Sequence, residues 1–320
     1  MENNIKKTLE LLNNDLEWEE RYAKYITYLE GKQSKGFKKP EGLSVYSSIS
    51  KYKGSTYDLR YDGQSVGLVV SRQDKISLRP QKEANLKYFN DSFIKDKEEV
   101  DWHSKEATEF RRYFRDHAKN SSKFNLKSSE HRVENRLLRE FAKKTRAENK
   151  SLTNIQPITL NGCFFQLPTP LKASNHAPSY AKQYGGGIDI LSRIKINGKS
   201  RICVMEVKDE NKDSESQAQA MEQALTYATF IATLLKSKSG QEWWDFFMGR
   251  GSKTRKMSTL LDIDVVTIMP KGNSEEFADK QIRFPNLATF HCHSLYYDDS
   301  VFNKGLGEFK FSGSFLEHWK

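Results

Sequence analysis

The chain has 320 residues, 37% of them hydrophobic and 12% aromatic, and a formal net charge of +10. This length supports a hydrophobic core without disulfides, and the aromatic content argues against wholesale disorder. No apolar run is long enough for a membrane span, and no secretory signal is visible in the polar, acidic N-terminal stretch. Three widely separated cysteines, Cys163, Cys203 and Cys292, indicate reduced thiols of a cytoplasmic protein rather than a disulfide framework or a CxxC metal site.

Residues 1–120 are expected to form an N-terminal α+β module. Apolar residues at helical spacing predict one helix over residues 4–30. After a lysine- and glycine-rich linker, Asp62-Gly63 predicts the turn of a β-hairpin, because this dipeptide tolerates the positive φ angles that such turns need. The other predicted elements of the module are strands at 57–61, 65–71 and 75–78, and helices within 81–120 that connect it to the second domain.

Residues 121–320 are expected to form an α/β domain, a mixed sheet flanked by helices. Its first helix is predicted over 129–148, with an apolar stripe that includes Val133, Leu137 and Phe141. The elements that follow are predicted as strands at 158–167, 187–196 and 200–208, a helix at 215–236 and a buried strand at 263–269. The order of helix, three strands, helix and strand is typical of an α/β core.

A basic segment lies at the start of this domain, because most of the excess positive charge falls between residues 111 and 150. Such a field attracts polyanions, although a basic helix is also found as a plain solvated face. Arg132, Arg136, Arg139 and Lys143 recur at spacings of four, three and four residues, so they share one face of the predicted helix. We expect this row to contact nucleic-acid phosphates.

Two carboxylates are predicted to face each other across a hairpin. If Asn197-Gly198 forms a two-residue turn, Asp189 lies directly opposite Glu206, and Lys208 lies on the same face as Glu206. Like charges opposite each other repel, and Mg²⁺ or Mn²⁺ with hard oxygen ligands relieves that repulsion. The alternative is a strand-edge aspartate beside an ordinary surface ion pair.

The residues around these carboxylates resemble those of the PD-(D/E)XK nuclease superfamily. The resemblance is carried by the runs GGGIDI and RICVMEVKDE and by a following helix with the sequence QALTY, and it covers about residues 128–270. Gln223 and Tyr227 are similar to the QxxxY motif of the RecB-like branch. Ile188 stands where the family often has a proline.

The resemblance implies a restriction-endonuclease-like core and a role for each matching residue. Asp189, Glu206 and the backbone carbonyl of Val207 would bind the metal, and Lys208 would be the catalytic lysine. The acidic residue that the family carries on its first helix would be Glu134, with Glu140 as the weaker choice.

A polar stripe on the second helix, formed by Gln219, Gln223 and Tyr227, is expected to reach the nucleic-acid backbone and support the site. The sequence therefore predicts a cytoplasmic, Mg²⁺- or Mn²⁺-dependent nuclease acting on DNA, with restriction, phage defence and repair all open as roles. Two alternatives are a non-catalytic nucleic-acid-binding or assembly module on the same fold and an RNA-directed nuclease. A homo-oligomer or a partner protein is left open, and no membrane is expected.

Overall fold

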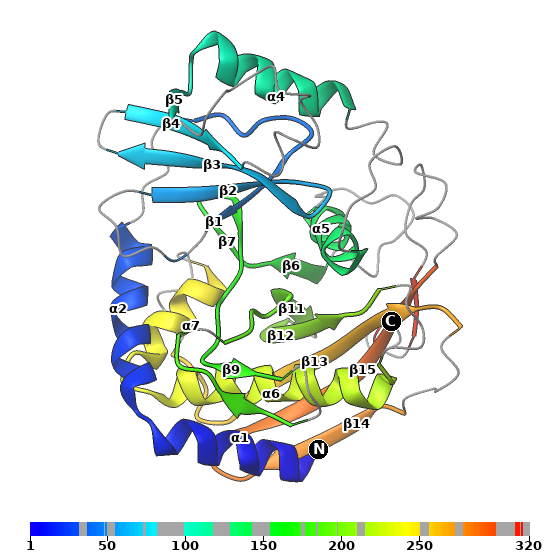
Figure 1. The fold of residues 1–320 in the computed structure, drawn as a ribbon. Helices are drawn as coiled ribbons and strands as arrows, with labels where there is room; N and C mark the ends of the chain where they lie inside the picture. The colour runs from blue at the N-terminus through cyan, green and yellow to red at the C-terminus, as the bar shows by residue number, and fades with distance from the viewer. Residues whose placement is uncertain are drawn as a thin grey trace.

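Two mixed β-sheets flanked by helices organise the chain in the computed structural model (Figure 1). The structure describes residues 1–31, 37–47, 49, 55–72, 75–81, 99–117, 129–142, 154–173, 177–183, 185–196, 198–209, 215–249, 256–272, 278–298, 311–313 and 315. No helix within these ranges is both long and apolar enough to cross a membrane.

The first sheet belongs mainly to the N-terminal half, and its strand order is β5-β4-β3-β2-β1-β8-β7. Asp62 and Gly63 connect β2 and β3 with φ angles of 45° and 91°, so the predicted hairpin turn is confirmed. The strands of this sheet are β1 (Ser44–Ser47), β2 (Ser55–Tyr61), β3 (Gln64–Arg72), β4 (Lys75–Pro80), β5 (Val100–Asp101), β7 (Thr159–Leu160) and β8 (Cys163–Phe165).

Helix α4 (Lys105–His117) covers this first sheet at the top of Figure 1. Its buried Phe110 and Phe114 share one apolar cluster with Tyr57 and Leu59 of β2. The helix expected to be a connector is therefore part of the core of the N-terminal module.

The second sheet has the order β14-β15-β13-β12-β11-β6, with β16 paired to β15. β11 and β12 are antiparallel, whereas β12, β13 and β15 run parallel to one another. The strands are β6 (Ile155–Pro157), β11 (Ile190–Ile196), β12 (Lys199–Val207), β13 (Leu261–Pro270), β14 (Lys280–Phe284), β15 (Ala288–Tyr297) and β16 (Phe311–Ser312). A separate two-stranded ribbon contains β9 (Leu171–Lys172) and β10 (Ser179–Tyr180).

Helices pack on both faces of the second sheet, because successive side chains along its strands point into two different apolar clusters. Helix α5 (Ser129–Phe141) buries Val133 and Leu137 against Ile190 of β11 and Met205 of β12. On the opposite face, α6 (Gln217–Lys236) and α7 (Gly240–Met248) share a cluster with Ile202, Val204 and Val265. Figure 1 shows α5 between the two sheets and α6 on the far side of the second sheet.

Two helices, α1 (Glu2–Asn14) and α2 (Glu17–Gly31), replace the single N-terminal helix expected over residues 4–30. The break comes at Asp15, whose backbone is extended and whose Oδ1 accepts a hydrogen bond from the backbone N–H of Glu17 at 3.0 Å. The indole of Trp18 then donates to the carbonyl of Leu12 at 3.0 Å, which holds the corner. A periodicity count cannot detect this corner, because apolar residues continue through it.

The boundary expected near residue 120 does not separate two independent cores. Buried residues of α1 and α2 belong to the cluster around α6, so the N-terminal helices complete the core of the second sheet. Conversely, β7 and β8 fold within the expected strand 158–167 but join the first sheet, and β6 takes the edge of the second sheet instead. The chain passes between the two halves more than once.

Candidate active site

The predicted hairpin of β11 and β12 is confirmed with its register. Ile196 pairs with Lys199 and Ile190 with Met205, which brings Asp189, one residue before β11, to Glu206. Gly198 has a φ of 77°, a value that glycine adopts easily, while Asn197 lies outside the described residues. The Oδ2 atom of Asp189 accepts a hydrogen bond from the backbone N–H of Val207 at 2.9 Å, so its carboxylate is fixed against the end of β12.

A clamp of three side chains holds Lys208, which follows β12. The Nζ atom lies 2.9 Å from Oε1 of Glu206, 2.8 Å from Oε1 of Gln223 and 2.8 Å from Oε2 of Glu215. Gln223 also donates to Oε1 of Glu215 at 3.0 Å. The lysine is thereby tied both to the sheet and to the start of α6.

Acidic side chains crowd the end of this hairpin. Burial raises the pKa of Asp189 well above its ordinary value, and the charges of Glu206, Glu134 and Glu130 raise it further. Burial also raises the pKa of Glu206, although the nearby ammonium of Lys208 opposes that shift. The site therefore favours retaining protons on this pair until a cation compensates its charge.

Lys208 is cationic at neutral pH. Burial alone lowers the pKa of its ammonium, but the charge of Glu206 and the hydrogen bond to Glu215 outweigh that effect and raise it. A lysine in this state donates hydrogen bonds and stabilises negative charge, and it is not available as a proton acceptor.

The oxygen atoms at the site suit a hard divalent cation. Oε2 of Glu206 and Oε1 of Glu134 are buried and have no hydrogen-bond partner among the described residues. Oε2 of Glu134 lies 3.4 Å from Nδ1 of His131, and its Oε1 lies 4.0 Å from a guanidinium nitrogen of Arg60. Among the described residues, no group of three or more His, Cys, Asp or Glu side chains is arranged as a metal site.

The weaker candidate on the same helix, Glu140, is also buried. It lies six residues beyond Glu134, about 240° around the helix, so the two side chains leave α5 in different directions. Of the two, Glu134 is the one whose charge acts on Asp189.

The three residues of the polar stripe on α6 take three different roles. Gln219 accepts a hydrogen bond from the backbone N–H of Ser216 at 2.8 Å and forms a capping box with it. Gln223 holds Lys208, and Tyr227 is buried beneath the glycine run, where a Cβ on Gly186 would meet its hydroxyl at 2.4 Å. Gln219 thus caps the start of the helix, and its expected contact with nucleic acid stays a prediction.

The basic row on α5 is divided. Arg132 and Arg136 both form ion pairs with Asp62 in the β2–β3 turn, each with an N–O distance of 3.0 Å. Arg139 is exposed, and Lys143 lies outside the described residues. The first two arginines therefore join α5 to the N-terminal sheet, and within the described part of the row Arg139 faces solvent.

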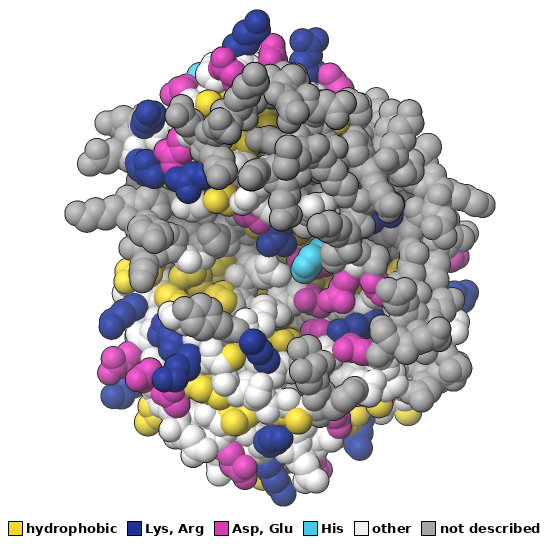
Figure 2. Space-filling view, viewed as in Figure 1, with side chains coloured by type: hydrophobic (Ala, Val, Ile, Leu, Met, Phe, Trp, Pro, Cys, Tyr) yellow, Lys and Arg dark blue, Asp and Glu magenta, His cyan; other side chains and the backbone are white. Residues whose placement is uncertain are grey.

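Sequence reasoning missed Glu215 and Glu130, the two acids that complete the surroundings of Lys208. The pattern Ser216-x-x-Gln219 is a capping-box signal that fixes the start of α6 and would have placed Glu215 immediately before it. Figure 2 shows Asp and Glu side chains gathered on this face below the position of α5.

Comparisons with known proteins add nothing to this geometry. No family model matches the chain, and neither a curated protein nor a solved structure matches it. The arrangement of its own residues therefore carries the functional argument.

Proposed function

We propose that this protein is a metal-dependent nuclease that hydrolyses phosphodiester bonds of DNA. The observation that carries the proposal is the meeting of Asp189, Glu206 and Lys208 at one end of the β11–β12 hairpin, with the lysine bound to Glu206 at 2.9 Å. The order of α5, β6, β11, β12, α6 and β13 supports a core like that of the PD-(D/E)XK nucleases.

Asp189, Glu206 and the carbonyl of Val207 would hold the cation, with Glu134 as a further carboxylate. Burial raises the pKa values of both facing carboxylates, so it is unfavourable for both to be ionised without a nearby positive charge. A bound cation would supply that charge, and Oε2 of Glu206 has no hydrogen-bond partner among the described residues. When bound there, Mg²⁺ or Mn²⁺ would supply Lewis acidity toward a phosphoryl oxygen and toward the attacking water.

Lys208 would act as a fixed positive charge beside the reacting phosphate. In hydrolysis, the hydroxyl of water goes to phosphorus and its proton to the oxygen that leaves. Negative charge develops on the phosphoryl oxygens, and a protonated lysine already oriented by Gln223 and Glu215 stabilises that charge without reorganisation.

The competing function is a non-catalytic nucleic-acid-binding or assembly module on the same fold. In such a protein, nothing requires a protonated lysine between two acids at the end of a strand. The three residues Asp189, Glu206 and Lys208 therefore favour the enzyme.

Incubation with supercoiled, linear and single-stranded DNA and with RNA, with and without Mg²⁺ or Mn²⁺, tests the proposal. We expect metal-dependent cleavage of DNA that is abolished by Asp189→Asn and by Glu206→Gln. Both variants should stay folded, and their melting temperatures without metal should hold or rise, because each change removes one of two repelling carboxylates. Undiminished cleavage by both variants would contradict the assignment, and cleavage of RNA alone would replace DNA with RNA as substrate.

A further inference from the structure

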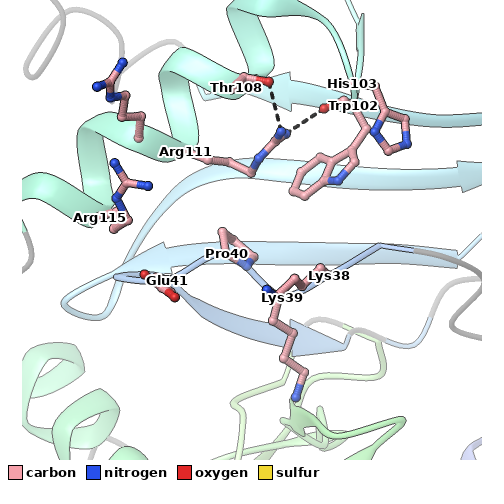
Figure 3. Close-up of a pocket in the computed structure, with 10 residues that line it drawn as sticks. Lys38, Lys39, Pro40, Glu41, Trp102, His103, Thr108, Arg111 and Arg115 are labelled. Carbon is pink, nitrogen blue, oxygen red and sulfur yellow. Dashed lines mark hydrogen bonds between the residues drawn. The ribbon is translucent and has the colours of Figure 1, made fainter.

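A second charged region lies on the N-terminal module, away from the carboxylate hairpin. A groove of about 680 Å³ runs between α4 and the segment 38–41 that leads into β1. Figure 3 shows this segment below α4, with the indole of Trp102 between the two. The groove is lined by Lys38, Lys39, Pro40, Glu41, Trp102, His103, Thr108, Arg111, Arg112 and Arg115.

The lining is strongly cationic. It contains five Lys and Arg side chains, one histidine and one carboxylate, that of Glu41. Asp116 is shared by Arg112 and Arg115, at 3.8 Å and 3.0 Å, so one acid serves two guanidinium groups. Lys39 extends toward the β7–β8 turn and donates to the carbonyl of Gly162, which leaves the other four cations to define the charge of the groove.

Arg111 forms the inner wall of the groove and is fixed by neutral partners. It donates to the carbonyl of Trp102 at 2.6 Å and to the hydroxyl of Thr108 at 3.2 Å, and its guanidinium lies 4.2 Å from the centroid of the Trp102 ring. No carboxylate among the described residues compensates its charge. A partly buried guanidinium without a counter-charge favours an anion in the groove.

From these observations we propose that the groove binds the sugar–phosphate backbone of DNA as a second contact region. Arg111 and Arg115 lie four residues apart, about 6 Å along the helix, so they can contact different phosphates of one strand. Arg111 covers one face of the Trp102 ring and the residue as a whole is buried, so the groove does not present this ring for stacking on a base. Recognition is therefore of the backbone and independent of base sequence.

This inference rests on the proposed function for its ligand, but it makes a prediction about binding alone. The test variant is Lys38→Gln/Arg112→Gln/Arg115→Gln, which removes three exposed cations and leaves Arg111 in place to hold Trp102. Its matched control, Lys6→Gln/Lys7→Gln/Lys24→Gln, removes the same charge from exposed positions on α1 and α2.

Affinity for a fluorescent 30-base-pair DNA duplex is measured in EDTA, from 50 to 200 mM salt. We expect the test variant to bind at least tenfold more weakly at low salt. The slope of log K against log salt should flatten by about 0.9 for each phosphate that the variant no longer neutralises, and by up to about 2.7 in all. The control should keep the slope and stay within about twofold of the parent. Unchanged binding by the test variant, equal weakening in the control, or no binding by the parent would overturn the proposal.

Failure of this inference is distinguishable from failure of the proposed function. Metal-dependent cleavage by the parent, together with undiminished duplex binding by the test variant, would remove the groove and leave the nuclease. Weakened binding by the test variant, together with no cleavage under any metal, would remove the nuclease and leave the groove.

Discussion

The carboxylate hairpin and the α4 groove concentrate charge of opposite sign, and they manage it differently. At the hairpin, Glu206 is buried and lies close to Asp189, so part of the repulsion is relieved by protons and by the clamped Lys208. In the groove, Arg112 and Arg115 are exposed, and water screens their repulsion. Burial therefore raises the carboxylate pKa values at the hairpin, which suits it to bind a cation. Exposure in the groove leaves the positive charges ionised, which suits them to bind an anion.

The largest effect is expected from Lys208→Ala. It should lower turnover by about 10² or more, because the fixed positive charge that stabilises the transition state is removed, while metal binding is kept. Steady-state cleavage and a separate metal titration check this. A collapse of metal affinity together with the rate would make the lysine structural.

A smaller effect on stability is expected where α5 is joined to the first sheet. Asp62→Asn keeps a residue that tolerates the positive φ of 45° but removes the charge that pairs with Arg132 and Arg136. We expect a decrease of about 2 kcal/mol in the free energy of unfolding, below the ~3–5 kcal/mol of a fully buried pair, because both arginines are partly exposed. Urea denaturation measures it, and an unchanged midpoint would show that the ion pairs do not stabilise the junction.

The two glutamines of α6 should separate in their effects. Gln223→Ala removes one of the groups that orient Lys208, and turnover should fall by about tenfold. Gln219→Ala removes half of a capping box and should cost about 0.5–1 kcal/mol of stability with the rate unchanged. Parallel cleavage and melting measurements decide this, and a fall in rate with Gln219→Ala equal to that of Gln223→Ala would contradict the division.

The pH dependence of stability gives the smallest effect. Burial, reinforced by Glu206, raises the pKa of Asp189 in the folded protein, so the favourable contribution of this acid is complete below its unfolded pKa and is lost as pH rises through its folded pKa. In EDTA, Asp189→Asn should therefore gain in melting temperature relative to the parent, by a few degrees, as pH rises from 5 to 8. The exposed Glu242→Gln on α7 serves as the control and should show no such trend. If the difference in melting temperature between Asp189→Asn and the parent stays constant from pH 5 to 8, the pKa of Asp189 is not raised in the folded protein.

Local signals in the sequence predicted the hairpins well. The turn at Asp62-Gly63 and the pairing of Asp189 with Glu206 follow from turn chemistry and strand alternation, which act over a few residues. These signals do not determine which sheet a short strand joins. β7 and β8 therefore appeared to belong to the second sheet. In the structure β8 pairs with β1, more than 100 positions earlier in the chain, and β7 pairs with β8.

The parts of the site that sequence alone could not supply are long-range contacts. Helical spacing gave the face that carries Arg132 and Arg136 but not their partner, Asp62, which lies about 70 residues earlier. Likewise, alternation placed Lys208 beside Glu206, but its contact with Glu215 depends on how the chain returns at the start of α6. The sequence shows that a residue is polar, whereas its ion-pair or hydrogen-bond partner is determined by the fold.

Calorimetric titration of the metal-free protein with Mn²⁺ at pH 8 tests the central claim most directly, because it needs no substrate. We predict that the parent binds Mn²⁺ with release of protons from the carboxylate pair, that Asp189→Asn and Glu206→Gln each weaken binding at least tenfold, and that Lys208→Ala keeps it. Equal Mn²⁺ affinity in the parent and in both carboxylate variants would contradict the claim that Asp189 and Glu206 form a metal site.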